Sequence, residues 1–122
     1  MKKKSNFSIP FTHLKNNVLG RNFELSLVFA DNSLSRRLNR TYRGYDKSTN
    51  VLSFLLSEKS GEIFIDLVTA KREAKSFGMT FTNFVKFLYI HALLHLNGME
   101  HGDTMEKREL KLLHGTPNRS GH

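Results

Sequence analysis

Three of the six histidines of this 122-residue chain lie within eleven positions, in the segment His91-Ala-Leu-Leu-His-Leu-Asn-Gly-Met-Glu-His101. His91 and His95 are four residues apart, so on a helix their side chains share one face and can direct two imidazole nitrogens at one metal ion. Asn97-Gly98 favours the end of that helix, because both residues tolerate the left-handed conformation. The reversal there can carry His101 back toward the pair, and the segment therefore predicts a metal site of three histidines.

The chemistry of such a site follows from its ligands. The chain has no cysteine, so a metal must use histidines or carboxylates. Three neutral histidines leave one open position on tetrahedral zinc, where a bound water has a pKa of about 7 and a phosphoryl or carbonyl oxygen can be polarised. One Zn²⁺ per chain is the predicted cofactor. The alternative is that His91 and His95 are core or partly exposed histidines satisfied by backbone carbonyls.

The residue after the first histidine indicates which bond is hydrolysed. Zinc proteases of the HExxH pattern have a glutamate there as general base, whereas this chain has Ala92. A peptidase of that design would lack its base, which favours phosphoester over peptide hydrolysis. Glu100, beside His101, is a candidate catalytic acid or base or a partner of the metal ligands, and a solvated loop carboxylate is the alternative.

Basic residues outnumber acidic ones, 19 to 11, and the formal charge of +8 favours a polyanionic partner such as RNA. The densest basic stretch also contains two tyrosines that can stack on unpaired bases. The candidate RNA-binding residues are Arg36, Arg37, Arg40, Tyr42, Tyr45 and Lys47. The alternatives are a solvated helix face for the basic residues and packing on the sheet for the tyrosines.

The elements that must position these residues are expected to form one α+β domain over residues 1–114, followed by a disordered tail at 115–122 that is rich in turn formers. Its small mixed sheet should have about four strands, the last two forming an antiparallel hairpin. The expected strands are residues 6–9, 23–29, 50–56 and 62–67. The expected helices are residues 10–20, a segment capped by Asp31 or Ser33 and ended by Gly44, and residues 69–77, 81–96 and 104–113.

The helix over residues 81–96 is apolar nearly all round, so we expect it to be the central buried helix carrying the HxxxHxxxxxH metal motif. Lys86 lies almost opposite the histidines and marks the expected solvent side. No apolar run in the chain is long enough to cross a bilayer. A cytoplasmic location without a membrane partner is expected.

The histidine segment resembles HGxLHLxGYDH, the signature of the YbeY endoribonucleases, bacterial factors for ribosomal RNA maturation and ribosome quality control. Residues 38–54 are similar to the NxxYRxxDxxTDVLSF region of that family, and residues 61–65 resemble its GDIxI strand. The departures remove no proposed ligand. They are Ala92 for glycine, Met99 for tyrosine, Glu100 for aspartate, Asn50 for aspartate and Leu55 for proline, with a shorter loop between the VLSF and GEIF segments.

By this resemblance His91, His95 and His101 would bind zinc, and Arg43 would be the functionally important arginine near the metal. A guanidinium there can stabilise charge on phosphate oxygens. The implied function is a zinc-dependent endoribonuclease that prefers single strands and acts on ribosomal RNA, with small-subunit precursor RNA and ribosomal proteins as partners. Water and the neighbouring 2'-hydroxyl are both open as the nucleophile.

Two other functions remain open at this point. One is a non-catalytic RNA-binding or ribosome-binding assembly factor with a structural metal, which the basic charge also supports. The other is a zinc peptidase or small-molecule hydrolase, which Ala92 disfavours.

Overall fold

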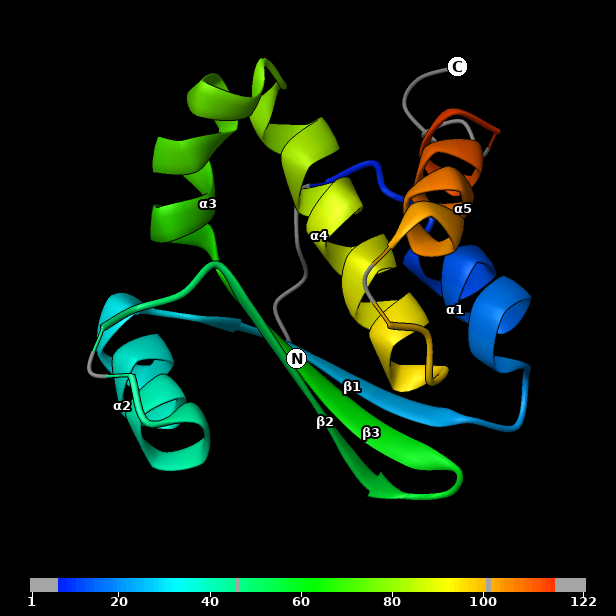
Figure 1. Cartoon of the computed structure of the whole chain (residues 1–122), viewed down its shortest axis with the longest axis horizontal. Coiled ribbons are helices and arrows are strands. Elements are labelled where there is room, and N and C mark those ends of the chain that lie inside the picture. Colours follow the sequence, from blue (N-terminus) through cyan, green and yellow to red (C-terminus); the bar gives the residue numbers. More distant parts are fainter. Residues whose placement is uncertain (1–6, 46, 101, 116–122) are drawn as a thin grey trace.

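The computed structural model describes residues 7–45, 47–100 and 102–115 of the chain (Figure 1). Its sheet has the order β1-β3-β2, in which β1 (Glu24–Ala30) runs parallel to β3 (Ser60–Asp66) and β2 (Val51–Ser57) runs antiparallel to β3. The α+β class, the mixed sheet and the antiparallel hairpin are confirmed. The expected number of about four strands is wrong, because the described residues form three.

The missing strand is the one expected at residues 6–9. Residue 6 lies outside the described residues, and residues 7–10 have no regular secondary structure. The Phe7 ring packs at 5.8 Å from Phe29 and 5.4 Å from Phe81, measured between centroids, and Ile9 is buried. Pro10, which has no N–H to join a strand ladder, then precedes helix α1 (Phe11–Leu19). The segment is therefore anchored by its side chains instead of by strand pairing.

Helix α2 (Asn32–Arg43) lies on one face of the sheet (Figure 1). It begins where the Asp31 carboxylate accepts a hydrogen bond from the backbone N–H of Leu34 at 2.8 Å, and it ends at Gly44, whose φ is +79°. Both boundaries agree with the sequence prediction. Because Gly44 adopts the left-handed conformation, the chain can turn directly after Arg43 toward β2.

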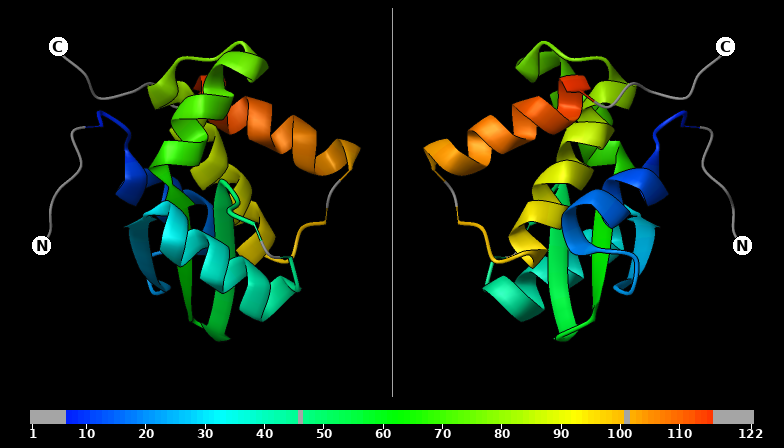
Figure 2. Two further views of the ribbon diagram at one scale, coloured as in Figure 1. Left: turned by 90° about the vertical axis from the view of Figure 1, so that its left-hand side faces the viewer. Right: turned by 90° about the vertical axis from the view of Figure 1, so that its right-hand side faces the viewer.

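The opposite face of the sheet is covered by α4 (Phe81–Leu96), and the remaining helices surround α4 (Figures 1 and 2). Those helices are α1, α3 (Leu67–Ala74), the short 3₁₀ helix η1 (Lys75–Phe77) and α5 (Asp103–Gly115). Ten of the sixteen residues of α4 are buried, so the predicted central helix is confirmed. None of the helices in the described part of the chain combines the length and apolar composition that a membrane crossing needs.

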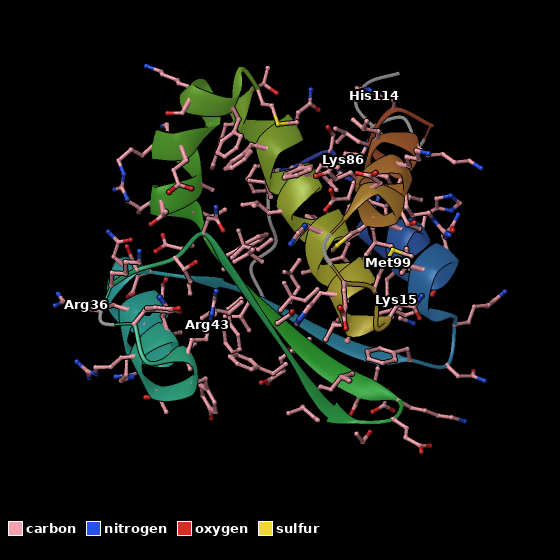
Figure 3. All side chains as sticks on the ribbon, in the orientation of Figure 1. Lys15, Arg36, Arg43, Lys86, Met99 and His114 are labelled. Atoms are coloured by element: carbon pink, nitrogen blue, oxygen red, sulfur yellow. The ribbon has the colours of Figure 1, made fainter. Side chains whose placement is uncertain are left out.

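Lys86 does not lie on a solvent-exposed side of α4, as the sequence suggested. It is only 2% exposed, and its Nζ donates a hydrogen bond of 3.0 Å to the carbonyl oxygen of Leu113, near the end of α5. Figure 3 shows Lys86 between the two helices. Burial lowers the pKa of this ammonium group. The prediction failed because α5 returns along the side of α4 that periodicity alone would leave to water.

Candidate functional site

The histidine pair and the predicted arginine meet in one pocket. This pocket has a volume of about 500 Å³, and its lining comes from the end of α2, from β2 with the residues before it, and from α4. The lining residues are Arg43, Thr49, Asn50, Val51, Leu52, Ser53, Phe54, His91, Ala92 and His95. Arg43 is nearly 50 residues from the histidines in the chain, so its place in their pocket is a property of the fold. We call this cavity the histidine pocket.

The His91 ring is held by a carboxylate from α5. Its Nδ1 atom is hydrogen-bonded to Oε2 of Glu109, a side chain that is almost completely buried. A carboxylate on one imidazole nitrogen sets the orientation of the ring and its tautomer, and it makes the other nitrogen a better metal ligand. A metal bound to His91 would therefore use Nε2.

Sequence reasoning missed Glu109. The signal was a carboxylate in the apolar stripe of α5, where Met105, Leu112 and Leu113 are also buried. A buried glutamate requires a partner, because desolvation of an unpaired carboxylate is costly. The stripe predicts that Glu109 has such a partner, but it does not identify His91.

The His95 ring has a corresponding contact with the sheet. Ser53 Oγ lies 2.8 Å from His95 Nδ1, within hydrogen-bond distance. This contact also leaves Nε2 as the nitrogen for a metal when the hydroxyl accepts from Nδ1–H. Ser53 was missed as well, although it is a polar residue in the apolar strand β2, between Leu52 and Phe54.

The described residues do not assemble a complete metal site. No three His, Cys, Asp or Glu side chains come together as a metal-binding group within residues 7–45, 47–100 and 102–115. The expectation of a metal motif on the central helix is thus wrong for the described residues, in which α4, ending at Leu96, contributes His91 and His95 without a third ligand. His101, the third predicted ligand, belongs to the connection toward α5 and lies outside the described residues.

Arg43, which lines the histidine pocket, also lies near an exposed tyrosine. Its Cζ atom lies 5.9 Å from the centroid of the Tyr45 ring, and Lys47 Nζ lies 5.9 Å from the same centroid. Both distances are within the range of cation–π attraction. Tyr45 is 56% exposed. The ring therefore lies close to two cationic side chains, of which Arg43 lines the pocket.

The other predicted residues are more distant from this pocket. Arg36, Arg37 and Arg40 are exposed along α2, and the structure does not place them in the lining of the histidine pocket. Figure 3 shows Arg36 on the outer side of α2, whereas Arg43 points toward the sheet. Glu100 is exposed and is also absent from the described lining. The structure therefore leaves Glu100 outside the lining of the histidine pocket and separates Arg43 from Arg36, Arg37 and Arg40.

Comparison with known proteins identifies related chains. The family model described as Endoribonuclease YbeY matches residues 3–116. A protein named Endoribonuclease YbeY from Geobacillus kaustophilus is 38% identical over 100 residues, which cover 70% of this chain and 64% of the relative. Its counterpart from Caldanaerobacter subterraneus subsp. tengcongensis is 39% identical over 105 residues, covering 71% and 66%. The chain thus spans slightly less than two thirds of the length of these relatives.

A solved structure shows the same fold. The solution structure of TM1509 from Thermotoga maritima superposes with a TM-score of 0.62 at 26% sequence identity, over 83% of this chain and 72% of that chain.

Proposed function

The chain belongs to the YbeY endoribonuclease family, and on that premise we propose that it is a metal-dependent endoribonuclease, a hydrolase of RNA phosphodiester bonds. The observation that carries the proposal is the histidine pocket. It combines two imidazoles, each with its Nδ1 held by a neighbouring group, and the guanidinium of Arg43. Paired imidazoles suit a metal ion, and a guanidinium suits a phosphate.

The proposed cofactor is one Zn²⁺ per chain, held by Nε2 of His91, Nε2 of His95 and the side chain of His101. The residues present fit this ion, because the carboxylate of Glu109 and the hydroxyl of Ser53 are hydrogen-bond partners of the two Nδ1 atoms. Such partners orient the imidazole rings of metal-bound histidines. When bound, zinc supplies Lewis acidity toward a phosphoryl oxygen. Glu109 and Ser53 keep the rings oriented throughout the reaction.

Arg43 is the proposed charge-stabilising residue. Its guanidinium can donate two parallel hydrogen bonds to non-bridging phosphate oxygens, whose charge grows as the phosphodiester bond is cleaved. The Tyr45 ring limits the positions that the guanidinium samples. Arg43 and the histidine pair, all residues of this chain, thus position the phosphate between them.

The finer assignments of the family resemblance also belong to this proposal. They are cleavage of single-stranded ribosomal RNA, above all small-subunit precursors, a role in ribosome quality control, contact with ribosomal proteins and a cytoplasmic location. The formal charge of +8 supports an RNA partner.

The test combines metal analysis with RNA cleavage by the purified full chain. We expect one zinc per chain, loss of zinc in His91→Ala, and cleavage that stops with a chelator and returns when zinc is added. A 2',3'-cyclic phosphate product would identify the neighbouring 2'-hydroxyl as the nucleophile. RNA binding without cleavage, together with unchanged metal content in His91→Ala, would contradict the proposal and favour a non-catalytic assembly factor.

A further inference from the structure

A second pocket adjoins the histidine pocket at the free edge of the sheet. It measures about 470 Å³ and lies between α2 and the β2–β3 hairpin. Ser53 and Phe54 line both pockets. These two residues lie in β2, an edge strand of the sheet, and neighbouring side chains of a strand point to opposite faces. Ser53 accordingly reaches His95, whereas Phe54 packs against Tyr42. The two pockets therefore join around the edge of β2.

The second pocket presents an aromatic ring that is supported from behind. The Tyr42 ring lies 4.7 Å from the Phe54 ring, and the Phe54 ring lies 6.0 Å from that of Phe64, measured between centroids. Tyr42 is nevertheless 63% exposed, and the pocket is further lined by Leu55 and Leu56, which are 58% and 61% exposed. Large apolar side chains that remain exposed side by side in a hollow are typical of a binding surface.

The charge of the pocket indicates which part of an RNA it suits. Among the described residues of its lining, Glu62 is the charged one, and it lies opposite Phe54 across the hairpin. A carboxylate repels phosphate, but it accepts hydrogen bonds from the exocyclic amino groups of bases. The exposed tyrosine offers a stacking surface to the flat face of a base. The lining thus suits a nucleobase and not the RNA backbone.

A base in the second pocket would lie close to the phosphate in the histidine pocket. Tyr42 and Arg43 are consecutive residues of α2, with Cα atoms about 3.8 Å apart. One lines the second pocket and the other lines the histidine pocket. A base on Tyr42 and a phosphate at Arg43 therefore belong to the same nucleotide or to neighbouring ones. A base inside a duplex is already paired and stacked, so it cannot enter the pocket without being extruded.

We propose that this pocket is a nucleobase subsite, which binds an unpaired base carrying an exocyclic amino group next to the phosphate held at Arg43. This inference rests on the proposed function and extends it, because it supplies a physical origin for a preference for single strands. Tyr42 stacks on the base, Leu55 and Leu56 cover the edge of the base, and Glu62 accepts from its amino group.

Binding of a probe that needs no cleavage tests the subsite. The full chain is titrated into 2'-O-methyl oligoribonucleotides that carry one 2-aminopurine, a fluorescent purine whose emission is quenched by stacking, at successive positions. We expect quenching at one position, and a Kd about 5- to 100-fold higher in Tyr42→Ala, the range for loss of one base–aromatic stack. Tyr42→Phe should keep both the quenching and the Kd. Leu110→Ala, an exposed apolar residue on α5 outside the pocket, serves as the matched control.

The outcomes separate the subsite from the ribonuclease activity. Quenching that depends on Tyr42 supports the subsite even if the chain cuts no RNA. Cleavage by a Tyr42→Ala variant with unchanged Kd and kcat/KM overturns the subsite and leaves the proposed function in place. Equal quenching of the probe in single strands and in duplexes would also overturn it. Glu62→Gln should reduce the preference for cytosine over uracil at the quenched position, and an unchanged preference would contradict the role of the carboxylate.

Discussion

The imidazole of His91 on α4 and the buried carboxylate of Glu109 on α5 form a hydrogen-bonded pair that joins the two helices at the histidine pocket. His91 and Glu109 are 18 residues apart in the sequence, and the connection that contains His101 lies between them. The position of α5 therefore controls the orientation of a proposed metal ligand. It follows that substitutions on α5 can change metal binding without removing a ligand.

Replacement of Glu109 tests this relationship. Glu109→Ala should weaken zinc binding by about 10- to 100-fold, the usual effect of removing a partner of a metal-bound histidine. Glu109→Gln should be less affected, because its amide oxygen can still accept from Nδ1–H of His91. Competition with a chromophoric chelator measures the affinity. Glu106→Ala, an exposed residue one turn earlier, is the control, and equal affinities in all three variants would refute the role of Glu109.

Ser53 should have the smaller effect of the two supporting residues. Its 2.8 Å contact with His95 is a neutral hydrogen bond near solvent, and such bonds contribute about 0.5–1.5 kcal/mol. Ser53→Ala is thus expected to weaken zinc binding by about 2- to 10-fold. Isothermal titration of the metal-free chain with zinc provides the measurement. Ser57→Ala lies on the same strand and removes a hydroxyl that contacts Ser60 instead. A Ser53→Ala loss no larger than that of Ser57→Ala would count against the proposed role.

Arg43→Lys separates charge from hydrogen-bond geometry. Lysine keeps the positive charge but lacks the planar pair of donors that binds a phosphate bidentately. The kcat/KM for RNA cleavage should fall by about 10- to 100-fold, with a larger loss of about 10²- to 10³-fold in Arg43→Ala. Zinc content should remain unchanged, because Arg43 is not a ligand. Arg37→Ala removes an exposed arginine of the same helix and should have little effect. A lysine variant with full activity would show that charge alone suffices.

Lys86 should make the free energy of unfolding depend on pH. Burial lowers its pKa below the ordinary value of 10.5, so the folded state releases this proton at a lower pH than the unfolded state. Between the lowered pKa and 10.5 the unfolded state binds more protons, and the free energy of unfolding rises with pH. Below the lowered pKa both states are protonated, so this contribution is constant.

Substitution of Lys86 by methionine removes the titrating group and keeps most of the apolar stem. Urea unfolding of wild type and Lys86→Met at about pH 7 and about pH 10 should show wild type gaining stability relative to the variant at the higher pH. The same comparison with Lys111→Met, on the exposed side of α5, should show no such gain. Parallel pH profiles for wild type and Lys86→Met would contradict the assignment.

Local sequence determined much of this protein. Caps such as Asp31 and Thr80 and stop signals such as Gly44 define helix ends, because they satisfy or terminate backbone hydrogen bonds within a few residues. The four-residue spacing of His91 and His95 likewise places both on one helix face. Strand alternation and a short polar turn were enough to predict the β2–β3 hairpin. Each of these features depends on neighbours in the chain.

Only the tertiary structure decided which distant groups meet. Residues 7–10 carry strand-like apolar side chains, yet they are anchored in the core without joining the sheet. Lys86 is buried because α5 packs beside it, and Glu109 reaches His91 for the same reason. A periodic pattern shows that a helix face is apolar, but the partner of a buried polar group depends on how elements far apart in sequence pack together. The supporting residues of the histidine pocket therefore became visible only in the folded chain.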